Sequence, residues 1–116
     1  MNAKDRLHEE RPWGSFIRFT HNEPTTVKLI TVKPGEAFSL QRHAHRSEFW
    51  RIVSGSGVVR KGGATLEAYP GAEFFIEQGE LHRASATDQD LIILEIAFGD
   101  FDESDIERVE DRYGRT

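Results

Sequence analysis

The sequence predicts an all-β domain, an antiparallel sandwich or barrel, and two observations support this prediction. Short segments rich in Val, Ile, Phe, Thr and Leu recur along most of the 116 residues. Turns such as Pro34-Gly35 and Pro70-Gly71 separate these segments at short intervals. Many short strands with glycine and proline between them are typical of antiparallel sheets that pack together or close on themselves.

Nine segments from residue 15 onward have this character. The last of them is almost entirely apolar, so we expect it at the centre of a sheet, where both faces are covered. The expected strands are 15–20, 26–33, 37–41, 47–54, 57–60, 64–69, 73–76, 81–86 and 91–98.

The two ends of the chain differ from this pattern. The first twelve residues are polar and charged, and we expect an arm or a frayed terminus there. Residues 102–111 (DESDIERVED) are expected to form a short helix, with Ser104 as its N-cap and Glu107 as the capping-box partner. The predicted organisation is an N-terminal arm (1–12), a β-barrel (13–101) and a C-terminal helix and tail (102–116).

Composition excludes several classes of protein. The chain has no cysteine, which rules out disulfides, thiolate metal sites and thiol nucleophiles. No apolar run reaches the roughly 18 residues of a membrane span, and the N-terminus has no apolar region like that of a signal peptide. The net charge of -5 does not favour a nucleic-acid binder. We therefore expect a cytoplasmic protein without membrane or nucleic-acid partners.

A cluster of residue types that bind metals lies near the middle of the chain. Side chains two apart on a strand share a face, so Gln41, His43 and His45 are expected to point the same way. Glu48 follows with a hard oxygen ligand, and His82 comes after a later turn. Such a set suits one divalent ion, with zinc as the first choice and manganese, iron, cobalt or nickel as alternatives. The residues leave open whether Gln41 or His45 is the fourth ligand.

The same residues resemble the two motifs of the cupin superfamily. The resemblance implies a double-stranded β-helix, which is a jelly-roll barrel. The motif residues are Gly35, Gln41, His43, Glu48 and Gly55 in the first motif, and Gly71, Gly79 and His82 in the second.

Four segments make the resemblance more specific, and together they extend over nearly the whole chain. They are similar to the type II mannose-6-phosphate isomerase domain, which is often the C-terminal part of bifunctional mannose-1-phosphate guanylyltransferase/isomerases. The chain departs from the usual patterns at Phe49, Glu77 and Ala86. The similar segments are RPWGS (11–15), TVKPG (31–35), LQRHAHRSEFW (40–50) and EDRYGR (110–115).

The resemblance implies a metal-dependent aldose–ketose isomerase that converts mannose 6-phosphate to fructose 6-phosphate in sugar-nucleotide and polysaccharide metabolism. The bound ion would polarise the carbonyl group. His45 and Glu80, with Glu77 as a further option, are the candidate general bases. The alternatives are a cupin that binds a sugar or small acid without catalysis, and a different metal-dependent cupin enzyme such as a dioxygenase.

A phosphate group on the substrate requires arginine or lysine side chains. Arg42, Arg46 and Arg83 flank the proposed ligands and are the candidates. Alternation along a strand places Arg42 on the face opposite His43, where a solvated role is the competing interpretation.

We also expect a homodimer, formed through edge strands or an exchanged arm as in many single-domain cupins. A monomeric mass in light scattering would contradict this expectation.

Overall fold

The computed structural model describes residues 6–115, which form eleven β-strands and no helix. The strands are β1 (Leu7–Arg11), β2 (Gly14–Arg18), β3 (Thr25–Val32), β4 (Leu40–Arg42), β5 (Arg46–Ser54), β6 (Gly57–Lys61), β7 (Ala64–Ala68), β8 (Glu73–Ile76), β9 (His82–Ala86), β10 (Leu91–Gly99) and β11 (Glu107–Glu110). Each of the nine predicted strands overlaps one of these, so the all-β prediction is confirmed.

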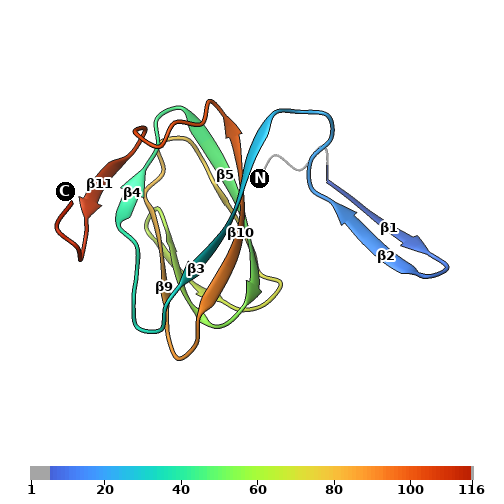
Figure 1. Ribbon diagram of the computed structural model, residues 1–116, viewed down its shortest axis with the longest axis horizontal. Coiled ribbons are helices and arrows are strands. Elements are labelled where there is room, and N and C mark those ends of the chain that lie inside the picture. Colours follow the sequence, from blue (N-terminus) through green and yellow to red (C-terminus); the bar gives the residue numbers. More distant parts are fainter. Residues whose placement is uncertain (1–5, 116) are drawn as a thin grey trace.

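Two antiparallel sheets enclose the core of the barrel (Figure 1). One has the order β3-β10-β5-β8 and the other the order β11-β4-β9-β6-β7. Alternate residues of β5 and β10 point inward, and β10 lies between β3 and β5, as its apolar sequence predicts. Burial of this apolar surface is the main favourable term in folding. The core residues are Val32, Trp50, Ile52, Val59, Ala68, Ala72, Phe74, Ile76, Ala84, Ala86, Leu91 and Ile93.

The predicted C-terminal helix is wrong. The Asp102 carboxylate accepts hydrogen bonds from the backbone N–H and the hydroxyl of Ser104, so this serine closes a turn and caps no helix. The following residues form β11, which pairs antiparallel with β4. The capping-box pattern is a local signal, and it loses here to hydrogen bonds with a strand far away in the sequence.

The N-terminal segment is a hairpin that projects away from the barrel (Figure 1). β1 and β2 pair in full register, from Leu7 opposite Arg18 to Arg11 opposite Gly14. The predicted boundary after residue 12 therefore falls in the hairpin turn. Residues 1–5 of the predicted arm and Thr116 of the predicted tail lie outside the described residues.

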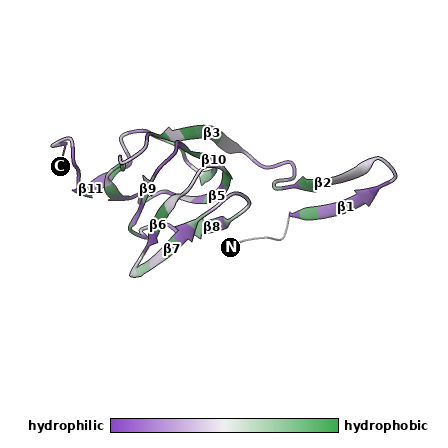
Figure 2. Ribbon diagram, turned by 90° about the horizontal axis from the view of Figure 1, so that it is seen from below, coloured by the Kyte–Doolittle hydropathy of each residue, from purple (hydrophilic) through white to green (hydrophobic). Residues whose placement is uncertain are grey.

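The outer face of β3 carries exposed apolar side chains. Val27 is 58% exposed and Leu29 is 67% exposed, and Figure 2 shows hydrophobic residues along this strand. Such a face could be covered by a second copy of the chain, but the homodimer stays a prediction. No helix in the described part of the chain is long and apolar enough to cross a membrane.

The turn between β5 and β6 requires glycine for two reasons. Gly55 has a φ of 91°, and a Cβ there would overlap the carbonyl oxygen of Asp90. Gly71 has a similar φ of 90° but open space around it. Gly55→Ala should therefore lower the free energy of unfolding by roughly 2–4 kcal/mol, and Gly71→Ala by about 1 kcal/mol. Urea unfolding of both variants measures the difference, and equal losses would contradict the overlap.

Candidate metal centre

Three buried side chains meet inside the barrel, and one potential ligand atom of each lies within 4.8 Å of the others. They are His43, just after β4, Glu48 in β5, and His82 at the start of β9. The Nε2 atom of His43 is 3.5 Å from Oε2 of Glu48, and Nε2 of His82 is 3.5 Å from Oε1 of the same carboxylate. The structure thus brings together three of the five predicted ligands.

Backbone carbonyl groups hold both imidazole rings in place. Nδ1 of His43 lies 2.6 Å from the carbonyl oxygen of Asp105, and Nδ1 of His82 lies 2.9 Å from that of Glu80. Because a carbonyl oxygen only accepts, each Nδ1 carries the proton and each Nε2 presents its lone pair to Glu48. This arrangement of the outer nitrogen is the usual one for histidines that bind metals.

Two atoms of the cluster are left without a hydrogen-bond partner among the described residues. They are Oε1 of Glu48 and Nε2 of His82, and both are buried. Both are acceptors, so they cannot satisfy each other, and buried polar atoms without partners are rare because desolvation is costly. A divalent cation would satisfy both. The two imidazoles and one carboxylate suit zinc, manganese, iron, cobalt or nickel, and they do not select among these metals.

The structure distinguishes the two candidates for the fourth ligand. Nε2 of Gln41 is 3.4 Å from Nε2 of His43, and its Oε1 accepts a hydrogen bond of 2.6 Å from Ser39. A turn of the amide would direct Oε1 at the cluster, because the serine hydroxyl can donate or accept. His45 is exposed, lies outside the cluster, and its backbone N–H donates to the Asp105 carboxylate. The geometry therefore favours Gln41.

Arg46 is the predicted phosphate-binding residue that reaches the cluster. It is buried, its Nε donates to Oε2 of Glu48 at 2.9 Å, and its Nη2 lies 3.3 Å from Nε2 of His43. Its guanidinium also stacks on the ring of Phe101, 4.3 Å from the centroid. Nε2 of His43 can bind a metal ion only when the Arg46 guanidinium moves away from it.

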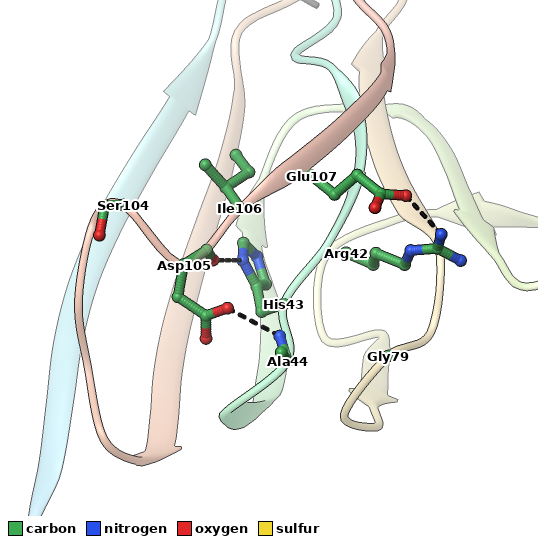
Figure 3. Close-up of a pocket in the computed structure, with 8 residues that line it drawn as sticks. All are labelled: Arg42, His43, Ala44, Gly79, Ser104, Asp105, Ile106 and Glu107. Atoms are coloured by element: carbon green, nitrogen blue, oxygen red, sulfur yellow. Dashed lines mark hydrogen bonds and ion pairs between the residues drawn. The ribbon is translucent and has the colours of Figure 1, made fainter.

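The other two predicted phosphate-binding arginines point elsewhere. Arg42 is exposed on the outer side of the barrel, where it pairs with Glu107 (Figure 3), as alternation along the strand predicts. Arg83 donates to the carbonyl oxygens of Phe38 and Glu110, which ties β9 to neighbouring segments. Both arginines are held by contacts within the chain, away from the cluster.

The predicted general bases Glu80 and Glu77 belong to a turn. Oε2 of Glu80 accepts from Lys61 at 3.1 Å, and Oε1 accepts from the backbone N–H of Glu77 at 3.1 Å. Neither residue lines the cavity beside the cluster. The Glu80 carboxylate stabilises this turn, and the structure brings neither glutamate, nor His45, to the candidate centre.

A cavity of about 190 Å³ opens next to the cluster, and it is lined by residues from both sheets and from the C-terminal segment. Several of them, above all Glu95 and Arg108, were not among the site residues that the sequence predicts. Glu95 stands alone as a carboxylate in the apolar segment 91–98, and that isolation is the signal that could have found it. The lining residues are Lys28, Ile30, Phe38, Gln41, His43, Arg46, Glu95, Glu103, Ile106, Arg108 and Arg115.

Glu95 lies deep in this cavity. Burial raises the pKa of its carboxyl to about 7, and the nearby Glu48 carboxylate adds to the shift. Nε1 of Trp50 donates to Oε1 of Glu95 at 3.2 Å.

A second hollow, of about 440 Å³, lies between the loop after β4 and the C-terminal segment (Figure 3). His43 lines both hollows, but Gln41, Arg46 and Glu95 line only the smaller one, so the smaller cavity is the one that serves the candidate centre.

A barrel of two antiparallel sheets around a buried His–Glu–His cluster is the arrangement expected of a cupin, and solved structures share the fold. A cupin protein from Bacteroides fragilis superposes with a TM-score of 0.59 at 21% identity, covering 65% of each chain. The capsular polysaccharide assembling protein CapF from Staphylococcus aureus gives a TM-score of 0.64 at 24% identity, covering 90% of this chain and 34% of that one.

The chain belongs to the family of the mannose-6-phosphate isomerase C-terminal domain, whose model matches residues 2–111. Xanthan biosynthesis protein XanB of Xanthomonas campestris is 40% identical over 91% of this chain, and alginate biosynthesis protein AlgA of Pseudomonas aeruginosa is 42% identical over 91%. A mannose-1-phosphate guanylyltransferase of Escherichia coli is 36% identical over 95%. The chain spans only 22 to 24% of the length of these relatives.

Metal content gives a direct test of the ligand assignment. His82→Ala should lower the affinity for zinc at least about tenfold, because even residues that only support a ligand contribute that much. His45→Ala should bind zinc as the wild type does, since His45 lies outside the cluster. Elemental analysis after dialysis against a defined zinc concentration measures both. Unchanged zinc content in His82→Ala, or loss in His45→Ala, would refute the assignment.

The buried His82 and Glu95 have opposite effects on the pH dependence of stability. Burial lowers the pKa of His82 from 6.5 to about 4, so between these values the unfolded chain binds the additional proton. Because protonation of His82 favours the unfolded chain, the free energy of unfolding decreases as the pH falls from 6.5 to about 4. Burial raises the pKa of Glu95 from 4.5 to about 7, so the folded state binds the additional proton there. Because protonation of Glu95 favours the folded state, the free energy of unfolding that it contributes is lost as the pH rises from 4.5 to about 7.

Removal of the carboxyl should expose the effect of the histidine. When metal-free Glu95→Gln is acidified from pH 6.5 to 4.5, it should lose about 2 kcal/mol more unfolding free energy than the wild type. Urea unfolding in the presence of EDTA at several pH values measures the two profiles. Parallel profiles would contradict the opposed shifts.

Proposed function

We propose that this domain is a metal-dependent isomerase that interconverts mannose 6-phosphate and fructose 6-phosphate. The observation that supports it best is the buried cluster of His43, Glu48 and His82, in which two acceptor atoms have no partner in the described part of the chain. Membership of the mannose-6-phosphate isomerase C-terminal family supports the substrate class. The relatives named for xanthan and alginate biosynthesis support a role in the supply of activated sugars for polysaccharides.

The residues of the cluster would hold one divalent ion, with Gln41 as the fourth ligand. When bound, the ion would polarise the sugar carbonyl and stabilise the negative charge of the enediolate. His43 and His82 would keep their orientation through the two backbone carbonyls, so little reorganisation would be needed.

An aromatic floor shields this site from water. The ring of Trp50 packs edge-on against His82, with centroids 5.5 Å apart, and Phe38 packs edge-on against Trp50 at 5.8 Å. Trp50 is buried, so one side of the cluster is closed by apolar surface. Exclusion of water strengthens every electrostatic interaction with a substrate placed there.

Two observations favour the second candidate, a cupin that binds a sugar phosphate without catalysis. The Arg46 guanidinium already contacts Glu48 and His43, and it supplies part of the positive charge that a metal ion would bring. The predicted bases also lie outside the cavity. In this function the arginine would stay in place, and ligand binding would not depend on a metal.

Turnover and metal dependence separate the two functions. Protein freed of metal with EDTA and loaded in turn with zinc, manganese, cobalt, nickel or iron should convert mannose 6-phosphate to fructose 6-phosphate, followed by a coupled assay. His82→Ala should lose at least about 100-fold in kcat/KM, because the ligand set is broken. His21→Ala, which changes an exposed histidine, should keep the activity. Binding of mannose 6-phosphate without turnover under any metal would favour the second candidate.

A further inference from the structure

One row of side chains crosses three strands and connects the candidate metal centre to Arg108. Gln41 of β4 lies opposite His82 of β9, and Arg108 of β11 lies opposite Gln41. Residues directly opposite on antiparallel strands project from the same face of the sheet. Because His82 points into the barrel, Arg108 does so too, two strand spacings or roughly 10 Å away.

The Arg108 side chain has no partner within the described residues. Its Nε is buried, and the side chain makes no hydrogen bond or ion pair between residues 6 and 115. The other cations that line the cavity each contact a carboxylate. These pairs are Lys28–Glu103, Arg46–Glu48 and Arg115–Asp111.

An unpaired guanidinium group at a partly desolvated position is unfavourable unless a ligand compensates it. The ligand must carry negative charge, because a guanidinium only donates hydrogen bonds and does not lose its proton. The planar fork of arginine matches the oxygens of a phosphate group, to which it can donate two parallel hydrogen bonds. A phosphate group is therefore one anion that would fit Arg108, which has no partner among the described residues.

We propose that Arg108 binds the phosphate group of a sugar phosphate whose carbonyl end lies at the candidate metal centre. In a hexose 6-phosphate these two groups stand at opposite ends of the carbon chain, which matches the separation of Arg108 from His82 along the row. Gln41, the proposed fourth ligand, lies between His82 and Arg108 in this row. The cavity of about 190 Å³ beside the row limits the ligand to a small molecule. The identity of the sugar rests on the proposed function, whereas phosphate recognition does not require turnover.

Calorimetry on the zinc-loaded protein tests the proposal with three probes: mannose 6-phosphate, mannose and inorganic phosphate. Arg108→Met keeps an apolar stem and removes the cation, and it should weaken binding of mannose 6-phosphate by roughly 10- to 100-fold. Inorganic phosphate should compete with mannose 6-phosphate on the wild type and bind more weakly to the variant. Mannose should bind both proteins equally. Arg60→Met removes an exposed arginine of β6 and should bind every probe as the wild type does.

Each outcome supports or overturns the assignment. Equal affinity of wild type and Arg108→Met for mannose 6-phosphate would overturn it, as would a wild type that binds neither phosphate probe. If Arg108→Met does not fold, Arg108→Lys is used in its place. This variant should bind mannose 6-phosphate more weakly than the wild type does, but more tightly than the wild type binds mannose, because lysine keeps the charge and loses the planar fork. An Arg108→Lys protein with wild-type affinity for mannose 6-phosphate would overturn the assignment. If the wild type binds mannose 6-phosphate through Arg108 but shows no turnover, the isomerase function fails and the phosphate site stands.

Discussion

The buried carboxylate of Glu48 sets the conditions that the rest of the site must meet. It is 1% exposed, and a carboxylate so far from water must be compensated by positive charge and hydrogen bonds. Arg46 compensates one of its oxygens, and the other faces Nε2 of His82, which is itself an acceptor. Within the described residues, Oε2 of Glu48 therefore has a hydrogen-bond donor, whereas Oε1 of Glu48 and Nε2 of His82 have none. A divalent ion is the simplest group that would complete the cluster, and this requirement joins the fold to the proposed chemistry.

The C-terminal segment contributes more to the site than its position in the chain indicates. The backbone carbonyl of Asp105 orients His43, and its carboxylate accepts hydrogen bonds from the N–H groups of Ala44 and His45. The strand that follows closes the edge of β4 and carries Arg108 into the barrel. One segment thus positions a candidate ligand, fixes the loop after β4 and supplies the proposed phosphate contact. A helix at this place would have done none of these.

Local patterns predicted most of the strands because alternation and turn residues act over a few residues. They also predicted that Arg42 and His43 point to opposite sides, and the structure agrees. The same rule failed for His45, because β4 ends at Arg42 and the loop that follows does not alternate. The capping-box pattern at Ser104 failed for a related reason: it describes a local preference, and pairing with a distant edge strand was more favourable.

The sequence by itself determined that this chain forms an antiparallel β-barrel and that His43, Glu48 and His82 are the residues to examine. These conclusions follow from residue types and short spacings. Only the tertiary structure decided that Gln41 lies beside the cluster and that Arg46 contacts Glu48. It also decided that Arg108 lines the cavity without a partner between residues 6 and 115. Strand register and burial decide such relations, because they bring together residues that are far apart in the chain and determine which charges lose their contact with water.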